Sequence, residues 1–397
     1  MDIEALLRKI NAQNDKWSEI YGRALPSVAI GRKKSFSAKS ALLYSMLLRS
    51  ALFILSLIPV SKPPKYIFQG LRHRTLIELL PAAEVMVLGG RNEFFYCIKS
   101  GYKFYWIGYI SKAFQLYMGA SQKEIFAKAI LFLHKLFTAQ SEEQKYLFLY
   151  EDSLPIGLTL SAALNDMQGL NVICIQHGIY FRYNDIFVPP EGMYCKFNLV
   201  WDSSQRKLYK GGGDPATFIL GLPYEMKPSI LLNRKVVLVG HSGRSSGLTE
   251  YFFSLYHFSK IFKILQDAGC DVSFRPHPQD DINFIRSVFP SVCIESKLDL
   301  FASGRMAFIG FASSLMYEAR QLGNIVISLD NSIFPFEMDI DLDGIVLERD
   351  YENLPLYLSR LFDDRSPLID INIESLSSRF HNCISQIDAF NASKGRG

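Results

Sequence analysis

The sequence lacks the features that would place it in several large classes of protein. Its 397 residues carry a net charge of only +4, from 43 Lys and Arg against 39 Asp and Glu. That balance is too mild to indicate a nucleic acid as partner, although it suits anionic small molecules or a membrane surface. Apolar residues make up 49% of the chain and charged residues 21%, which excludes a disordered or collagen-like protein. The length predicts two or three domains with substantial cores.

The sequence also has no CxxC pair, and its cysteines are scattered: Cys97, Cys174, Cys195, Cys270, Cys293 and Cys383. Isolated cysteines argue against both a zinc site and a disulfide framework. Cys97, Cys174 and Cys293 lie in apolar runs. We therefore expect them to be reduced thiols in the core of a protein from a reducing compartment.

No cleavable signal peptide is predicted, because residues 1–26 have the pattern of a charged amphipathic helix without an apolar centre. One long apolar run, residues 41–60, follows a basic stretch containing Arg32, Lys33, Lys34 and Lys39. Its length nearly suffices for a membrane span, but Arg49 lies in its middle, where a charge is costly. We expect residues 1–62 to form a helical extension whose apolar run lies at a membrane interface or packs on the protein.

From residue 63 onward, short apolar runs alternate with helical patterns. The expected strands cover residues 65–69, 84–88, 102–107, 147–150, 172–175, 198–201 and 217–220, then, after a linker at 228–234, residues 235–239, 271–274, 293–294, 306–309 and 325–329. The expected helices cover residues 72–80, 123–138, 155–167, 248–268, 313–322 and a final one near 373–390. This alternation is typical of parallel sheets with helices on both faces.

The sequence therefore predicts an α/β protein with two Rossmann-like, doubly wound domains facing a central cleft. The first covers residues 63–227 and the second residues 228–372, while residues 373–397 pack back on the first. Ligands of open α/β sheets bind at the carboxyl ends of the strands, and clefts between domains are favoured sites. Polar residues that directly follow strands are thus the candidates for function.

In the first domain, His177 follows a strand within Gln176-His177-Gly178. An exposed histidine on a tight turn can accept a proton near neutral pH; a turn histidine bonded to backbone is the alternative. Glu151 and Asp152 follow the strand at 147–150. They could act as base or orient His177, although capping of the next helix explains them nearly as well.

In the second domain, Arg275 and His277 follow a strand within Arg-Pro-His-Pro. The two prolines fix the backbone, and a cationic side chain there would neutralise a phosphate leaving group; a proline-rich turn is the alternative. Ser313 and Ser314 open a helix, whose N-terminus is an anion site. Glu318 lies on the same helix face as Ser314 and could reach a ribose hydroxyl.

The glycine-rich loop at residues 240–247, with Gly240, Ser242 and Gly243, has the position of a phosphate loop. It matches neither G-x-G-x-x-G nor G-x-x-x-x-G-K-[ST], so the motif is weak. The run Asp339, Asp341, Asp343 is interpreted as a solvated loop rather than a metal site. We predict no required metal and no cofactor.

Several of these segments, taken in order, resemble a known family. They are Q-H-G from Gln176, W-x-x-S-Q-R-K-L-Y-K-G-G-G from Trp201, G-L-P from Gly221, R-P-H-P from Arg275 and G-F-A-S-S-L-x-x-E-A from Gly310. The series looks like bacterial surface-polysaccharide glycosyltransferases of the GT-B architecture. The nearest likenesses are sialyltransferases, capsule transferases that use CMP-activated sugars, and the CDP-glycerol polyol-phosphate transferases of teichoic acid synthesis. The resemblance covers roughly residues 145–330.

The resemblance implies roles for single residues. In the sialyltransferases, the histidine of the H-P motif and the serines bind the CMP phosphate, so His277, Ser313 and Ser314 would hold the nucleotide. Those enzymes have an acidic D-D-G motif where this sequence has Gln176-His177-Gly178. The polyol-phosphate transferases have a histidine and a glycine at that point, the histidine acting as base. Either way, His177 is the implied base, with Glu151 or Asp152 as substitutes.

The function implied is a metal-independent glycosyltransferase that moves an acidic sugar, a sialic acid-like nonulosonate or Kdo, from a CMP-activated donor. The acceptor would be a capsule or lipopolysaccharide glycan, free or lipid-linked. A CDP-polyol phosphotransferase or other nucleotide-sugar transferase is the alternative within the same scaffold. From another class, a non-catalytic subunit that binds glycan or nucleotide sugar also remains open. The basic flank of residues 41–60 favours the anionic leaflet, so we expect a cytoplasmic protein in peripheral contact with the inner membrane.

Overall fold

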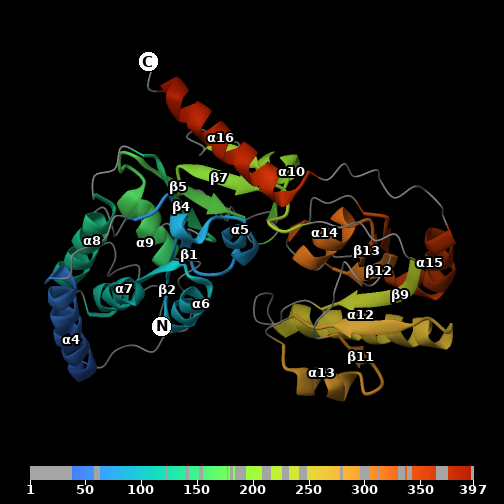
Figure 1. Ribbon diagram of the computed structural model, residues 1–397. Helices are drawn as coiled ribbons and strands as arrows, with labels where there is room; N and C mark the ends of the chain where they lie inside the picture. The colour runs from blue at the N-terminus through green and yellow to red at the C-terminus, as the bar shows by residue number, and fades with distance from the viewer. Residues whose placement is uncertain are drawn as a thin grey trace. The chain divides into compact units, whose positions relative to one another are not determined.

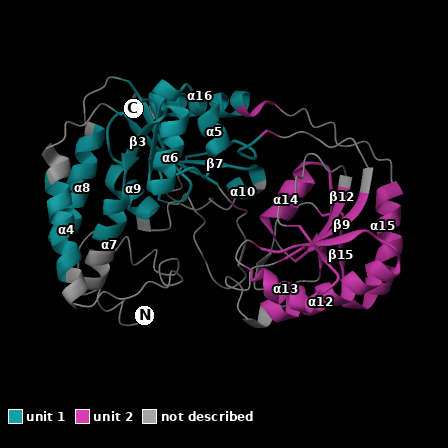
Figure 2. Ribbon diagram, turned by 60° about the horizontal axis from the view of Figure 1, so that its bottom comes forward, with its two compact units in different colours: residues 1–177, 189–224, 377–397 teal, residues 178–188, 225–376 magenta. Residues whose placement is uncertain are grey.

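The computed structural model divides the chain into two compact units (Figure 2). Unit 1 comprises residues 1–177, 189–224 and 377–397, and unit 2 comprises residues 178–188 and 225–376. The structure describes residues 38–57, 63–120, 123–138, 143–151, 155–176, 178, 182–183, 194–207, 216–225, 232–240, 248–277, 280–295, 305–311, 313–329, 336–337, 342–363 and 374–394.

Unit 1 is built on a seven-stranded sheet in the order β3-β2-β1-β4-β5-β7-β8, in which all neighbours are parallel. Its strands are β1 (Tyr66–Gln69), β2 (Val85–Gly89), β3 (Lys103–Trp106), β4 (Lys145–Leu149), β5 (Leu170–Ile175), β7 (Phe197–Val200) and β8 (Ala216–Ile219). The central strands β1, β4, β5 and β7 are buried at every residue. Strands covered on both faces are continuous apolar runs, which is why their sequence pattern is clear.

Helices cover the sheet of unit 1: α4 (Ala38–Leu57), α5 (Arg74–Glu78), α6 (Arg91–Ser100), α7 (Gly108–Ala120), α8 (Lys123–Thr138), α9 (Pro155–Leu164), α10 (Ser203–Lys207) and α16 (Leu376–Lys394), with a short 3-10 turn, η1 (Ala82–Glu84). Leu147 and Leu149 of β4 join the core formed with α7, α8 and α9, which also contains Leu48 and Leu52 of α4. No helix within the described residues is long and apolar enough to cross a membrane.

The C-terminal helix α16 covers the other face of the same sheet (Figure 1). Tyr146 of β4 donates its hydroxyl hydrogen to Asp388 Oδ1 at 2.6 Å, and Phe380 packs on Phe148 with ring centroids 5.5 Å apart. The Arg379 guanidinium donates to the carbonyl oxygens of residues 220, 222 and 224, at 2.6, 2.9 and 3.1 Å. A helix far along the chain thus completes the core of unit 1.

Unit 2 has a six-stranded sheet in the order β11-β10-β9-β12-β13-β15, again parallel throughout. Its strands are β9 (Leu232–Val239), β10 (Val272–Arg275), β11 (Cys293–Ile294), β12 (Arg305–Gly310), β13 (Ile325–Leu329) and β15 (Gly344–Val346); its helices are α12 (Leu248–Asp267), α13 (Ile282–Val288), α14 (Ser314–Gln321), η2 (Glu348–Asn353) and α15 (Leu354–Asp363). A separate antiparallel pair joins β6 (Arg182–Tyr183) to β14 (Phe336–Glu337).

Alternate residues of β9 enter two cores of unit 2. Val236 and Leu238 pack with α12 and α15, whereas Val237 and Val239 pack with Met316 of α14. This two-residue period follows from the geometry of a strand. The prediction of an α/β protein with two doubly wound units is confirmed by the strand orders of the two sheets.

The structure corrects three details of the sequence analysis. Residues 232–234 belong to β9, so the expected linker at 228–234 is wrong there. Cys97 and Cys174 are buried thiols, but Cys293 is exposed because it lies in a two-residue strand at the edge of the sheet formed by the described strands.

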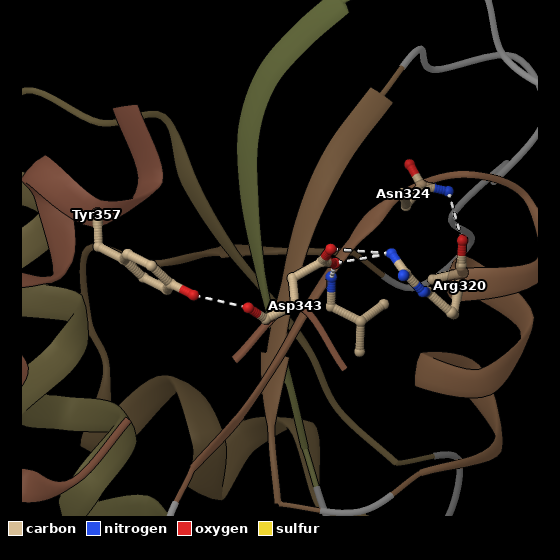
Figure 3. A network of polar contacts seen from close by, with 6 residues as sticks. Arg320, Asn324, Asp343 and Tyr357 are labelled. Carbon is tan, nitrogen blue, oxygen red and sulfur yellow. Dashed lines mark hydrogen bonds and ion pairs between the residues drawn. The ribbon is translucent and has the colours of Figure 1, made fainter. Parts of the chain in front are cut away.

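Asp343, which the sequence predicts to lie in a solvated loop, is instead bonded to three other elements. Its carboxylate receives two bonds from Arg320, at 2.9 and 3.1 Å, and one from the backbone N–H of Val326 at 2.7 Å. The Tyr357 hydroxyl donates to the Asp343 carbonyl at 2.6 Å (Figure 3). Asp343 therefore fastens β15 to β13, α14 and α15. Asp339 and Asp341 lie outside the described residues.

Candidate functional site

Both sheets have a topological switch point, where the strand order reverses. In unit 1 it lies between β1 and β4, and in unit 2 between β9 and β12. In open α/β sheets, ligands bind outside the carboxyl ends of the strands at such points. The residues that follow β1, β4, β9, β10 and β12 are therefore the ones whose geometry matters.

Two glycines hold the strand ends of unit 2 close together. A Cβ on Gly240 would lie 2.9 Å from Phe274 Cζ and 3.0 Å from the carbonyl oxygen of Arg275, and the N–H of Gly240 donates to that oxygen at 2.8 Å. A Cβ on Gly310 would lie 3.1 Å from the carbonyl oxygen of Val239 and 3.0 Å from Met316 Sδ. Glycine at both positions lets β9 approach β10 on one side and β12 on the other.

His277 begins a short turn that is closed by two hydrogen bonds between its backbone and Asp280. The N–H of His277 donates to Asp280 Oδ2 at 2.8 Å, and the N–H of Asp280 donates to the carbonyl oxygen of His277 at 2.9 Å. Burial lowers the pKa of the His277 imidazole, and the nearby Asp280 carboxylate opposes that shift. Because the net direction is downward, the imidazole is neutral near pH 7 in the absence of a ligand.

Arg275, a candidate for binding the donor phosphate, also forms a hydrogen bond within the fold. Its Nη1 donates to the carbonyl oxygen of Glu295 at 2.7 Å, and the Glu295 carboxylate forms an ion pair with Lys235. The side chain therefore connects the end of β10 to the segment that follows β11. Its predicted role toward a donor phosphate stays a prediction.

The paired serines differ in role. Ser313 has extended backbone and is the N-cap of α14, since its Oγ accepts a hydrogen bond from the N–H of Leu315 at 3.2 Å. Ser314 is the first residue of the helix, and its Oγ lies 3.6 Å from the position that a Cβ would take on Gly178. Ser314 and Glu318 are both partly exposed. N-capping thus accounts for a serine at position 313 but not for the second serine at position 314.

At the switch point of unit 1, Glu151 follows β4 with only 1% of its surface exposed. Gln69 Nε2, at the end of β1, lies 3.5 Å from Glu151 Oε1. A Cβ on Gly157 would lie 1.9 Å from the carbonyl oxygen of Glu151, so the start of α9 covers this residue directly. Because the Glu151 carboxylate is so enclosed, it is better placed to orient a neighbouring side chain than to contact an acceptor directly.

Gln176, for which the sequence predicts no role of its own, joins two strand ends. Its Oε1 accepts from the backbone N–H of Trp201 at 2.8 Å, and its Nε2 donates to Gln205 Oε1 at 2.7 Å. The Trp201 indole N–H donates to the carbonyl oxygen of Gln176 at 3.1 Å. The Q-H-G segment and the W-x-x-S-Q segment are therefore bonded to each other. Their positions after neighbouring strands were the signal that could have revealed the contact.

Four of the predicted site residues, namely Asp152, His177, Ser242 and Gly243, lie outside the described residues. Gly240, Arg275 and His277 come together at the ends of β9 and β10, and Ser313, Ser314 and Glu318 lie on or beside α14 after β12. Among the described residues, no group of three or more His, Cys, Asp or Glu side chains is placed to hold a metal ion.

No protein-family model matches the sequence, and no curated protein matches it. Solved structures with a similar fold include a GtfA/B complex, at 12% identity and a TM-score of 0.42, covering 66% of this chain and 59% of that one. The S. aureus protein TarM, determined with UDP, matches at 11% identity and a TM-score of 0.41 over 66% of this chain and 58% of that one. The wall teichoic acid polymerase TagF matches at 10% identity and a TM-score of 0.45, covering 90% of this chain and 100% of that one. The chain thus spans about three fifths of the first two.

Proposed function

We propose that this protein is a metal-independent glycosyltransferase of the GT-B type. The observation that carries the proposal is the junction of β9, β10 and β12 in unit 2. There Gly240 and Gly310 let the three strand ends lie close together, next to His277 on one side and the start of α14 on the other. A helix N-terminus and a histidine beside a glycine-lined strand junction suit the phosphate of a nucleotide.

The proposed donor is a CMP-activated acidic sugar, and the proposed acceptor is a hydroxyl of a bacterial capsule or lipopolysaccharide glycan. His177 would take the proton of that hydroxyl, whose oxygen attacks the anomeric carbon as the bond to CMP breaks. Negative charge grows on the departing phosphate. His277, Arg275 and the N–H groups at the start of α14 would stabilise it there, where stabilisation accelerates the reaction.

Roles for the remaining candidates follow from their positions. Glu318, on the same face of α14 as Ser314, would accept from a ribose hydroxyl. Glu151 would orient the base rather than replace it, because it is almost wholly enclosed. Ser242 and Gly243 would complete the loop over the phosphate. Each of these roles predicts a loss of donor affinity or of turnover when the side chain is removed.

A CDP-polyol phosphotransferase is the second candidate, favoured by the histidine and glycine at residues 177 and 178 where sialyltransferases have carboxylates. Release of the nucleotide from CMP-N-acetylneuraminate, CMP-Kdo, CDP-glycerol and UDP-sugars distinguishes the two. We expect turnover with a CMP-sugar in the presence of EDTA. Turnover with CDP-glycerol alone would replace the first candidate by the second, and binding without any turnover would support a non-catalytic subunit.

We also propose that α4 attaches the protein to the cytoplasmic face of the inner membrane. Ser45, Leu48 and Leu52 face the protein, and the opposite face of the helix exposes large apolar side chains: Leu42, Leu43, Met46, Leu47 and Phe53. Residues 20–77 contain ten Lys and Arg but no Asp or Glu. An apolar face within a basic segment favours anionic lipid.

Cosedimentation with vesicles tests this attachment. We expect the full chain to bind vesicles that contain phosphatidylglycerol and to bind pure phosphatidylcholine weakly. Leu47→Glu should reduce binding at least tenfold, whereas Ile345→Glu, at an equally exposed apolar residue of unit 2, should leave it unchanged. If both variants bound the vesicles equally well, α4 would not be the segment that attaches the protein to the membrane.

A further inference from the structure

A cavity lies in unit 1, at the opposite end of its strands from Glu151. It has a volume of about 470 Å³ and is lined by residues that precede β4, β5 and β7 or begin β5, together with Asn391 of α16. Because the strands are parallel, these residues all lie at the amino ends of the strands of unit 1, opposite to the carboxyl ends that Glu151 and Gln176 follow. In Figure 1, α16 runs across β5 and β7 in this part of unit 1.

The lining of this cavity is dominated by carboxamides. Five of its residues are Asn or Gln: Gln144, Asn165, Gln168, Asn171 and Asn391. It also contains one carboxylate, Asp166, and one ammonium group, Lys196, but no aromatic ring. A carboxamide both donates and accepts hydrogen bonds, so this lining is complementary to groups that do the same. The formal charges of the lining cancel.

Asn171 is a fully buried member of the lining, and one polar group of its side chain has no partner within the described part of the chain. The residue has 0% of its surface exposed. Its Oδ1 accepts from Asn391 Nδ2 at 3.0 Å, but within the described part of the chain its Nδ2 has no hydrogen-bond partner. Turning both amides by 180° would only leave Oδ1 unpartnered instead. Buried polar groups are normally satisfied, so this Nδ2 would gain a hydrogen bond if the side chains that enclose it moved to admit a hydroxyl group.

The walls of the cavity are held in place by the backbone. Asn165 Nδ2 donates to the carbonyl oxygen of Tyr194 at 3.1 Å, and its Oδ1 accepts from the N–H of Lys196 at 2.8 Å. Gly169 has φ +75°, with nothing within 4 Å of a Cβ placed there. Its carbonyl oxygen accepts from the N–H of Lys145 at 2.9 Å. The segment that carries Asn165 and Gln168 is therefore held by hydrogen bonds to the starts of β4 and β7.

We propose that this amide-lined cavity binds a neutral polyhydroxylated unit, either a sugar residue or a polyol. Hydroxyl groups donate and accept at once, as carboxamides do, and the volume lies in the range of small-molecule sites. An anionic group is disfavoured, since Lys196 is matched by Asp166 in the lining. This inference rests on the proposed function in one respect. The bound sugar or polyol would be part of the glycan acceptor, distant from the hydroxyl that reacts.

Saturation-transfer NMR on the full chain tests the proposal. The neutral probes are glycerol, galactose, N-acetylglucosamine and maltotetraose, and the anionic probes are glycerol 3-phosphate and N-acetylneuraminic acid. We expect signals from at least one neutral probe and at least a fivefold loss of them in Asn171→Leu. Gln168→Ala, at an exposed residue of the lining whose truncation should not disturb the core, should weaken the same signals. Asn382→Leu, on the exposed side of α16, is the matched control and should change nothing.

The outcomes separate this proposal from the proposed function. Neutral signals lost in Asn171→Leu, with no turnover of any nucleotide sugar, would support the cavity and contradict the enzyme. Turnover with no neutral signal, or with signals equal in the wild type, Asn171→Leu and Gln168→Ala, would overturn the cavity and leave the enzyme standing. Signals from the anionic probes alone would also overturn it.

Discussion

Gly178 lies against Ser314: a Cβ on Gly178 would be 3.6 Å from the Ser314 Oγ, which is ordinary van der Waals contact. Both residues belong to unit 2, and Gly178 directly follows His177 in the chain. The glycine of the Q-H-G segment thus lies beside the second of the paired serines, although the two belong to separate motifs in the sequence.

The first prediction concerns the space beside Ser314. Gly178→Ala should keep donor affinity within about twofold, because its methyl group would make only ordinary contact. Gly178→Leu should lower the affinity for CMP about tenfold or more, since the larger side chain would extend over the start of α14. Calorimetric titration with CMP measures both. Equal affinity in the two variants would show that nothing binds at Ser314.

The second prediction concerns the strand junction of unit 2. Gly240→Ala should destabilise the protein by about 1–3 kcal/mol, because its Cβ would meet backbone atoms that cannot move aside easily. Gly178→Ala is the control and should change the free energy of unfolding by less than about 0.5 kcal/mol. Denaturant unfolding measures both values. A stable Gly240→Ala variant would mean that β9 and β10 can separate without cost.

The third prediction is a pH dependence that follows from the lowered pKa of His277. A bound phosphate favours the charged imidazole, so binding takes up a proton and the affinity for CMP should rise as pH falls from about 8 to about 5.5. His277→Gln should remove most of this dependence. If the affinity of the wild type for CMP did not depend on pH, His277 would not contact the phosphate.

The same shift affects stability with a definite sign. The folded protein binds the His277 proton less readily than the unfolded chain, so its contribution is present above the ordinary pKa of histidine. It is lost as pH falls toward the lowered value. His277→Gln should flatten this part of the unfolding profile. A wild-type profile that already matches the variant would contradict the burial of the imidazole.

The fourth prediction concerns thiol chemistry. Cys293 is exposed and should react with a thiol reagent within minutes near pH 8. Burial raises the pKa of Cys97 to about 11 and that of Cys383 to about 12, so these thiols should react only on unfolding. Counting modified cysteines by mass spectrometry, with Cys293→Ser as control, measures the difference. Rapid modification of Cys97 in the folded protein would contradict its burial.

Much of the fold was predictable from the sequence because the parallel strands are buried on both faces. Continuous runs such as residues 147–150 and 325–329 are easily recognised. The helices at residues 91–100 and 108–120 were not predicted, since their patterns are mixed: Phe94 and Phe95 are exposed, whereas Tyr109 and Ile110 are buried. Tertiary packing, rather than periodicity, selects those elements.

The candidate site was predictable in position but not in detail. Residues after strands are found by locating the strands, which is how His277 and Ser313 emerged. The roles of Gln176 in joining two strand ends and of Arg275 in binding the Glu295 carbonyl depend on contacts between segments far apart in the chain. No local pattern encodes such contacts. The same holds for Asn171 and Asn391, which are 220 residues apart in sequence.

The most direct test of the enzyme proposal is the rate of CMP release from a CMP-activated acidic sugar, measured in EDTA with a glycan acceptor. We expect the wild type to turn over. His277→Ala should lose about 100-fold or more in rate, by analogy with the removal of a donor to a developing oxyanion. His177→Ala should be similarly slow while still binding CMP. Near-normal turnover by His277→Ala would contradict the proposed mechanism.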